Sequence, residues 1–252
     1  MVIIEKETIK NIPLLHVVQQ ENQDGTLPAV FFIHGITSMK ERNIQHAYML
    51  AEKGYRVILP DVLYHGERAE KKHIHAYFWK MVLNTIQELE MLKEHFVEAG
   101  LVDENRIGVA GTSMGAIITL GAMAKYEWIA VGVSLMGNPA YVEFAKHQLH
   151  IMEQNNIMLP LTDEQIAGQL AMLEPYDATL HRGDWKPRPL MFWHGKKDKV
   201  VPYQGAYDFY EALKPAYEQH DVPLSFTLDN KAGHAVPNKG VLKTVEWFDK
   251  YL

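Results

Sequence analysis

The 252-residue chain alternates short apolar runs with longer segments in which apolar residues recur at helical intervals. Short apolar runs of this kind are typical of strands buried on both faces, as in parallel sheets. The runs lie at residues 29–33, 55–60, 106–111, 130–136, 188–195 and 224–228. Because parallel strands need crossover helices, this alternation predicts an α/β domain with a mainly parallel sheet and helices on both faces. The first residues, up to about Gln20, are predicted to add one or two antiparallel strands at an edge.

Residues 139–184 interrupt the alternation, because they hold about two predicted helices between two strands instead of one. The segment is rich in Met, Leu and Ile. Thr162 and Gln165 have the spacing of a helix capping box, and so do Ser38 and Glu41 earlier in the chain. No linker or repeat divides the sequence. We therefore predict one domain, 1–252, with 139–184 as an insertion that forms either a lid or an enlarged crossover packed on the core.

Composition narrows the functional classes. Apolar residues make up 47% and charged residues 22%, as in an average globular protein. The net charge of -6, without a basic run, argues against a nucleic-acid partner. The absence of cysteine excludes thiolate chemistry, disulfides and cysteine-bound metals. The sequence has no signal-peptide pattern and no run of about 18 apolar residues, so we expect a cytoplasmic protein that does not insert into membranes. We expect it to be a monomer or a homodimer.

The most distinctive motif is Gly-Thr-Ser-Met-Gly at residues 111–115, between a predicted strand and a predicted helix. A nucleophilic serine at such an elbow has a strained backbone, and neighbouring segments approach so closely that the flanking positions must be small. Gly111 and Gly115 meet that requirement. The first N–H groups of the following helix can also stabilise an oxyanion. We therefore predict that Ser113 is a nucleophile, the alternative being a glycine-rich turn with an inert serine.

A nucleophilic serine needs a histidine base and an acid that orients the histidine. In a doubly wound hydrolase both follow the serine in the chain, on loops at the carboxyl ends of later strands. His234 lies between the last predicted strand and the last predicted helix, and Asp198 follows the strand before it. Asp177 and Asp184 precede that strand, so we expect them at its opposite end. The alternative for His234 and Asp198 is an ordinary place in a loop.

The oxyanion formed during such a reaction needs a second backbone donor. His34-Gly35 directly follows the apolar run at 29–33, and glycine there lets the backbone approach the nucleophile. The predicted donors are therefore the N–H groups of Ile36 and Met114. Alone, the dipeptide would indicate only a turn after a strand.

Together these motifs resemble an α/β-hydrolase of the dienelactone hydrolase and prolyl oligopeptidase group, especially the small esterases of Bacillus-type bacteria. The resemblance is carried by FFIHGITSMKE, DVLYHGER, GTSMG, HGKKDKVVPY and the final GH, so it covers nearly the whole chain. It implies an α/β-hydrolase fold. It also implies a catalytic triad of Ser113, Asp198 and His234, with Ile36 and Met114 in the oxyanion hole. Lipase-type relatives carry several glycines after His-Gly; the Ile36-Thr37 found here argues against bulky tertiary esters.

The substrate pocket is predicted from two parts of the sequence. By resemblance, DVLYHGER lies near the mouth of the site, where Asp61, His65 and Arg68 either shape the pocket or, equally well, stabilise the loop by hydrogen bonds. In the insertion, Tyr141 is predicted to close one wall, and the methionine-rich part to cover the acyl group. The predicted pocket residues are His34, Tyr64, His65, Tyr141 and Met158.

The predicted function is that of a serine carboxylesterase for small or medium acyl esters, which works through an acyl-enzyme and needs no metal or cofactor. The expected partner is thus a small-molecule ester. Two alternatives stay open at this point. The same three side chains could serve an amidase or aminopeptidase. The fold could also belong to a catalytically silent binding protein, although such a protein has no need of all three residues.

Overall fold

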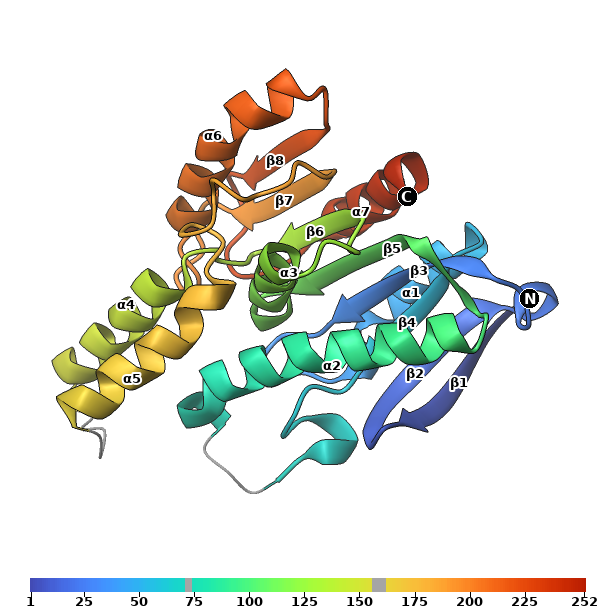
Figure 1. The fold of residues 1–252 in the computed structure, drawn as a ribbon, viewed down its shortest axis with the longest axis horizontal. Helices are drawn as coiled ribbons and strands as arrows, with labels where there is room; N and C mark the ends of the chain where they lie inside the picture. Colours follow the sequence, from blue (N-terminus) through green and yellow to red (C-terminus); the bar gives the residue numbers. More distant parts are fainter. Residues whose placement is uncertain (71–73, 156–161) are drawn as a thin grey trace.

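The computed structural model describes residues 1–70, 74–155 and 162–252. In this part of the chain eight strands form one sheet in the order β1-β2-β4-β3-β5-β6-β7-β8 (Figure 1). The strands are β1 (Val2–Ile9), β2 (Ile12–Gln19), β3 (Leu27–Ile33), β4 (Arg56–Pro60), β5 (Val102–Thr112), β6 (Val131–Leu135), β7 (Leu190–Gly195) and β8 (Leu224–Asp229). The hairpin of β1 and β2 is antiparallel to the rest and forms one edge, whereas β4 to β8 and β3 run parallel. The predicted fold class and the predicted edge strands are both confirmed.

Helices cover both faces of this sheet (Figure 1). They are α1 (Ile44–Glu52), α2 (Phe78–Glu98), α3 (Met114–Lys125), α4 (Tyr141–Gln154), α5 (Asp163–Leu173), α6 (Gln204–Gln219) and α7 (Asn238–Tyr251). Alternate residues of each strand face opposite layers. Phe31, for example, packs in the core under α2, α3 and α6, whereas Phe32 packs in the core under α1 and α7. The central strands are therefore buried on both sides, as their continuous apolar runs predicted.

One of the two predicted capping boxes is present. Thr162 accepts the N–H of Gln165, and the Gln165 side chain accepts the N–H of Thr162, at the start of α5. The prediction for Ser38 and Glu41 is wrong. The N–H of Ser38 closes a tight turn onto the carbonyl of Gly35, a 3-10 turn follows, and α1 begins only at Ile44.

The insertion contains α4, α5 and a 3-10 turn at Glu174–Tyr176, which agrees with the two helices predicted there. The two helices lie side by side and extend away from the body of the domain (Figure 1). Leu173 is the only buried residue of α5. Met158, a predicted pocket residue, lies outside the described residues. None of the helices described is long and apolar enough to cross a membrane.

Candidate active site

Ser113 occupies a sharp elbow between β5 and α3, as the motif predicted. Its φ of 57° and ψ of -116° are strained for a residue with a side chain. The flanking glycines are required by contact distance. A Cβ on Gly111 would come within 2.2 Å of the Gly115 backbone, and one on Gly115 within 2.1 Å of the carbonyl oxygen of Ile33. The strain at Ser113 is thus held in place by close packing of the strand, the turn and the helix.

The structure brings Ser113, His234 and Asp198 together. Nε2 of His234 lies 2.8 Å from Oγ of Ser113, and Nδ1 of the same ring lies 2.7 Å from Oδ2 of Asp198. In the neutral ring that fits both contacts, Nδ1–H donates to the carboxylate and Nε2 accepts from the serine hydroxyl. Ser113 and Asp198 are buried, whereas the His234 side chain is 23% exposed. The three residues come from three loops at one edge of the sheet, which the chain order had predicted.

Both oxygens of the Asp198 carboxylate accept hydrogen bonds from neighbouring groups. Its Oδ1 accepts the N–H groups of Val200 and Val201, at 2.9 and 3.0 Å, which leaves Oδ2 for His234. His194, buried at the end of β7, lies 3.5 Å from Oδ2 and contacts the carbonyl of Val201 at 2.8 Å. Burial alone would raise the pKa of Asp198, but hydrogen bonds from His194, His234 and Val201 lower it well below its usual value. The acid is therefore ionised throughout the neutral pH range.

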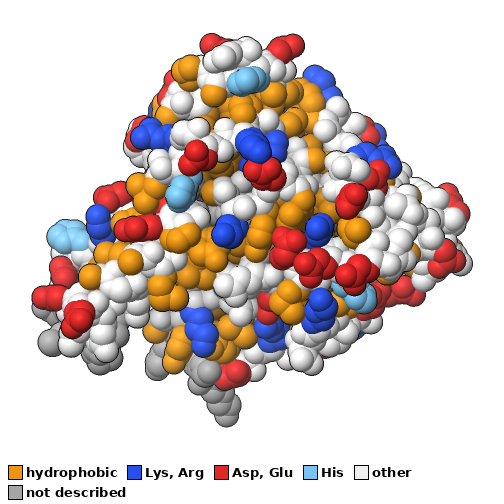
Figure 2. All heavy atoms as spheres, viewed as in Figure 1, with side chains coloured by type: hydrophobic (Ala, Val, Ile, Leu, Met, Phe, Trp, Pro, Cys, Tyr) orange, Lys and Arg blue, Asp and Glu red, His pale blue; other side chains and the backbone are white. Residues whose placement is uncertain are grey.

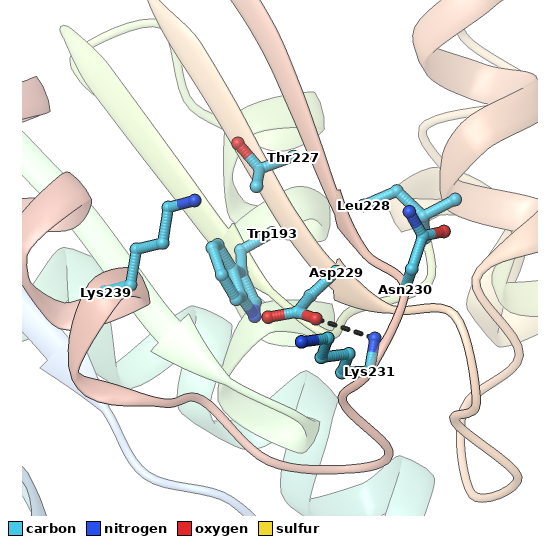
Figure 3. Close-up of a pocket in the computed structure, with 7 residues that line it drawn as sticks. All are labelled: Trp193, Thr227, Leu228, Asp229, Asn230, Lys231 and Lys239. Carbon is cyan, nitrogen blue, oxygen red and sulfur yellow. Dashed lines mark hydrogen bonds between the residues drawn. The ribbon is translucent and has the colours of Figure 1, made fainter.

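Hydrogen bonds to the Asp229 side chain fix the loop that carries His234. Oδ1 of Asp229 accepts the N–H groups of Lys231 and Ala232, and the carbonyl of Ala232 accepts the N–H of Lys197. A cavity of about 360 Å³ lies beside this loop, where the Trp193 ring stands between Lys239 and Asp229 (Figure 3). Ser113, Asp198 and His234 do not line it, so it is separate from these three side chains.

The two predicted oxyanion donors lie on segments that meet at the elbow. A Cβ on Gly35 would lie 3.3 Å from Cβ of Ser113, so the backbone leading into Ile36 packs directly against the serine. The neighbouring N–H groups in this loop are occupied: that of Thr37 by His65 and that of Ser38 by Gly35. Within the described part of the chain, the N–H groups of Ile36 and Met114 donate to no acceptor. Both remain available to a ligand.

The two histidines of the predicted pocket have other roles in the structure. Nε2 of His34 accepts the N–H of Val62 while its Nδ1 contacts the Gly35 carbonyl, and burial lowers its pKa to about 4. His65 makes the equivalent pair of contacts, with Thr37 and Leu63. Both imidazoles are buried, and they stabilise loops through hydrogen bonds instead of forming a polar pocket surface.

The tyrosines of the predicted pocket are also buried. Tyr141 is fully buried, and its hydroxyl donates to the carbonyl of Ile117 at 2.5 Å. Tyr141 was predicted to close one wall of the pocket, but α4 turns this side chain into the core against Gly121. Tyr64, with a positive φ of 66°, packs edge-on against Tyr77 and is 6% exposed.

Asp61 and Arg68 were predicted either to shape the pocket or to stabilise their loop. Their contacts favour loop stabilisation. Asp61 accepts the backbone N–H and the ammonium of Lys40, at 3.1 and 2.6 Å, and the N–H of Glu67. Arg68 donates to the carbonyl of Asp61 and forms a two-pronged ion pair with Glu88 on α2. Sequence reasoning missed Lys40, whose 1% exposure is unusual for a lysine. Its ammonium is paired with the buried carboxylate of Asp61 and also donates to Glu67 at 2.7 Å, which compensates its burial.

The carboxylate of Asp177 is occupied by contacts other than His234, and its place in the fold differs from the one predicted. Its Oδ2 accepts the N–H of Val142 in the first turn of α4, and its Oδ1 accepts from Thr179. It therefore lies near the carboxyl end of β6, where α4 begins, and not at the opposite end of the sheet. Its carboxylate stabilises the start of α4, where the helix dipole favours negative charge.

Among the described residues, one group of potential metal ligands comes together, at Glu5, Glu7 and His16 on the edge hairpin. Nδ1 of His16 contacts Glu7 at 2.6 Å, and its Nε2 faces the guanidinium of Arg56. The cation next to this histidine is thus an arginine of the chain itself, and the cluster is far in the sheet order from Ser113.

Comparison with known proteins gives a consistent result. The model of the prolyl oligopeptidase family matches residues 42–252. A Bacillus subtilis protein named "Putative esterase YitV" is 47% identical over 100% of both chains, and the Escherichia coli protein "Esterase YjfP" is 32% identical, again over 100% of both. Among solved structures, TT1662 from Thermus thermophilus is similar, with a TM-score of 0.74 and 19% identity over 100% of this chain and 98% of that one.

Proposed function

Because the chain belongs to the prolyl oligopeptidase family of serine hydrolases, we propose that it is a carboxylesterase that hydrolyses small or medium acyl esters. The observation that carries this proposal is the hydrogen-bonded series from Ser113 through His234 to Asp198. The names of the two full-length relatives favour an ester as the substrate. The expected partner is accordingly a small-molecule ester. The cytoplasmic location and the oligomeric state stay predictions.

In the proposed reaction His234 takes the proton of Ser113 through Nε2 as Oγ attacks the ester carbonyl. The imidazolium that forms is stabilised by the ionised Asp198, whose low pKa keeps it negatively charged. His234 then protonates the leaving alcohol, and an acyl group remains on Ser113. In the second half of the reaction His234 takes a proton from water, which attacks the acyl carbonyl. The proton then returns to Oγ of Ser113 as the carboxylic acid product is released. All proton transfers use groups of this chain.

The negative charge on the carbonyl oxygen is proposed to be stabilised by the N–H groups of Ile36 and Met114. Each lies next to Ser113, on one side through Gly35 and on the other as the first residue of α3. A donor of this kind contributes about 3 kcal/mol to the stability of the transition state. The positive end of the α3 dipole acts in the same direction.

We further propose that residues 139–184 act as a lid over the acyl group. The segment leaves the sheet after β6, at the edge where Ser113, His234 and Asp198 meet. Its first helix packs against the start of α2, where the ring centres of Trp79 and Tyr141 are 5.0 Å apart. Hydrophobic side chains gather along α4, α5 and the adjoining body of the domain (Figure 2).

Amide hydrolysis is the second candidate, because the matching family is named for an oligopeptidase and the same three side chains can cleave amides. The two candidates differ in one measurable ratio. Purified protein is assayed with nitrophenyl esters of graded acyl length and with nitroanilides of the same acyl groups. The esterase proposal expects turnover of the esters to exceed that of the matched anilides by orders of magnitude. Faster turnover of an anilide would favour the amidase.

The role of Ser113 is tested with a fluorophosphonate and with Ser113→Ala. We expect the probe to modify Ser113, located by peptide mass spectrometry, and the variant to lose about 10⁴-fold in kcat without loss of folding. Ser225→Ala, which changes a serine on β8, is the matched control and should be labelled like the parent. A folded parent that is not labelled would favour a silent binding protein.

A further inference from the structure

Two loops at the carboxyl edge of the sheet bind each other's backbones. One, residues 34–40, contains Ile36; the other, residues 61–68, follows β4. Three N–H groups are each accepted by a side chain of the opposite loop. The pairs are Val62 N–H with His34 Nε2 at 3.0 Å, Thr37 N–H with His65 Nε2 at 3.1 Å, and Lys40 N–H with Asp61 Oδ1 at 3.1 Å. The middle pair is the one nearest to Ile36 in the sequence.

Thr37 needs such a restraint because its backbone is strained. Its φ of 63° lies in the left-handed region, where a β-branched side chain is a rare outlier. Strain of this kind costs about 1–3 kcal/mol and persists only where surrounding contacts enforce it. The turn is closed from inside by the N–H of Ser38 on the Gly35 carbonyl, 3.2 Å away. The N–H of Thr37 in turn donates a hydrogen bond to Nε2 of His65 in the other loop.

His65 is fixed in the form that can accept this bond. Its Nδ1 lies 3.0 Å from the carbonyl of Leu63, to which it donates, so Nε2 carries the lone pair that faces Thr37. The ring is 4% exposed and packs 5.1 Å from the ring of His34. Burial lowers the pKa of His65, which keeps the imidazole neutral and able to accept.

We propose that His65 is a positioning residue: by accepting the N–H of Thr37, it fixes the turn at residues 35–37 so that the N–H of Ile36 is directed at the oxyanion formed on Ser113. The inference rests on the proposed function. His65 does not touch the substrate in this role. It removes the N–H of Thr37 as a competing donor and sets the orientation of the preceding peptide group.

Such a residue has a distinctive kinetic effect. The Ile36 donor acts on charge that develops in the transition state, so its misplacement lowers kcat and leaves KM nearly unchanged. Complete loss of one oxyanion donor lowers kcat by about 10²- to 10³-fold. A donor that is present but poorly held should lose less. We expect a decrease of about 10- to 100-fold for the loss of the His65 contact.

Two substitutions of His65 separate its two hydrogen bonds. His65→Gln places a side-chain oxygen near the position of Nε2, where it can accept from Thr37. His65→Asn reaches only the position of Nδ1, so it keeps the contact with Leu63 and loses the one with Thr37. Both are measured for kcat and KM on one ester and for the inhibition constant of a trifluoromethyl ketone. This ketone forms a hemiketal with the serine, whose oxygen occupies the oxyanion hole.

We expect His65→Asn to lower kcat by about 10- to 100-fold, to weaken the ketone by a similar factor and to change KM less than twofold. His65→Gln should recover most of both losses. Equal losses in the two variants, or a change confined to KM or to the melting temperature, would overturn the proposal. If the parent neither hydrolyses esters nor reacts with a fluorophosphonate, the proposed function fails first, which is a separate result.

Thr37→Gly tests the same restraint with His65 intact, and it serves if a variant of His65 does not fold. Glycine adopts a φ of 63° without strain and enlarges the freedom of the turn. We expect kcat and the affinity for the ketone to fall together by a few-fold, at a melting temperature close to that of the parent. An unchanged kcat in a variant whose turn is freer to move would show that the Ile36 N–H does not depend on the rigidity of this turn, which would overturn the proposal.

Discussion

Gly195, the last residue of β7, lies directly against the carbonyl oxygen of Gly233, and a Cβ on Gly195 would come within 2.1 Å of it. Gly195 begins the loop that carries Asp198, and Gly233 immediately precedes His234. The contact therefore connects the loop of the acid with the loop of the histidine. It explains how Asp198 and His234, 36 positions apart in the chain, keep a hydrogen bond of 2.7 Å.

Gly195→Ala is expected to reduce catalysis strongly in a folded protein. The new methyl group has to move the loop of His234 by about 1 Å, and a displacement of that size can lower the rate about 10²-fold. Steady-state kinetics with a nitrophenyl ester, together with a thermal melt, measures the effect. Gly233→Ala is the matched control, because its nearest new contact would be the carbonyl of Lys197 at 3.7 Å. Equal activity in the two variants would contradict the role given to this contact.

Asp198→Asn should lower kcat by about 10⁴-fold with little change in KM, because an amide favours the wrong tautomer of His234 and cannot stabilise the imidazolium. The comparison is Asp177→Asn, which loses an acceptor for the N–H of Val142 at the start of α4. This second change should lower the free energy of unfolding by about 1 kcal/mol and leave kcat for acetyl esters nearly unchanged. The opposite pattern would make Asp177 the acid.

Chain order and strand ends were enough to predict which residues meet at Ser113. In a parallel sheet the loops after successive strands emerge at one edge, so Ser113, Asp198 and His234 could be placed together without knowledge of packing. Close contacts of the two motif glycines also follow from the motif itself. The catalytic roles of these residues nevertheless stay proposals, because geometry alone measures no rate.

Side-chain direction could not be read from the sequence. Tyr141 is the first residue of α4, and a small rotation of that helix decides whether its ring faces the pocket or the core. Lys40 likewise has the sequence context of a surface helix start, yet it pairs with Asp61, 21 residues later. Contacts between two loops depend on how both loops fold. The sequence pattern of either loop alone does not contain that information.

The lid proposal predicts a specific effect of Thr162→Ala. This change removes the capping box of α5, which costs about 1 kcal/mol of helix stability. Because α5 buries little of its surface, the melting temperature should hardly change. If α5 covers the acyl group, KM should rise more for octanoyl than for acetyl esters. Asp163→Ala, which leaves the capping box in place, is the control. An equal KM effect on both esters would contradict a lid.

Acid should destabilise the fold through His46, a buried residue of α1. Neither of its ring nitrogens has a partner among the described residues, and its ring lies 4.4 Å from that of Phe32. Burial lowers the pKa of His46 to about 4. The unfolded chain binds a proton below about pH 6.5, whereas the folded chain does so only near pH 4. Stability is therefore fully present above pH 6.5 and is lost as the pH falls between these values.

His46→Leu should remove this pH dependence. Each pH unit below about 6.5 corresponds to about 1.4 kcal/mol for one such histidine, so the difference in unfolding free energy between pH 7.5 and pH 5 should shrink by about 2 kcal/mol. At pH 7.5 the variant should be at least as stable as the parent, because leucine leaves no buried polar atom unpaired. Urea titrations at both pH values measure the change. His220→Leu, at the exposed end of α6, is the control and should keep the difference of the parent. An unchanged difference in His46→Leu would mean that the folded protein protonates His46 at its ordinary pKa.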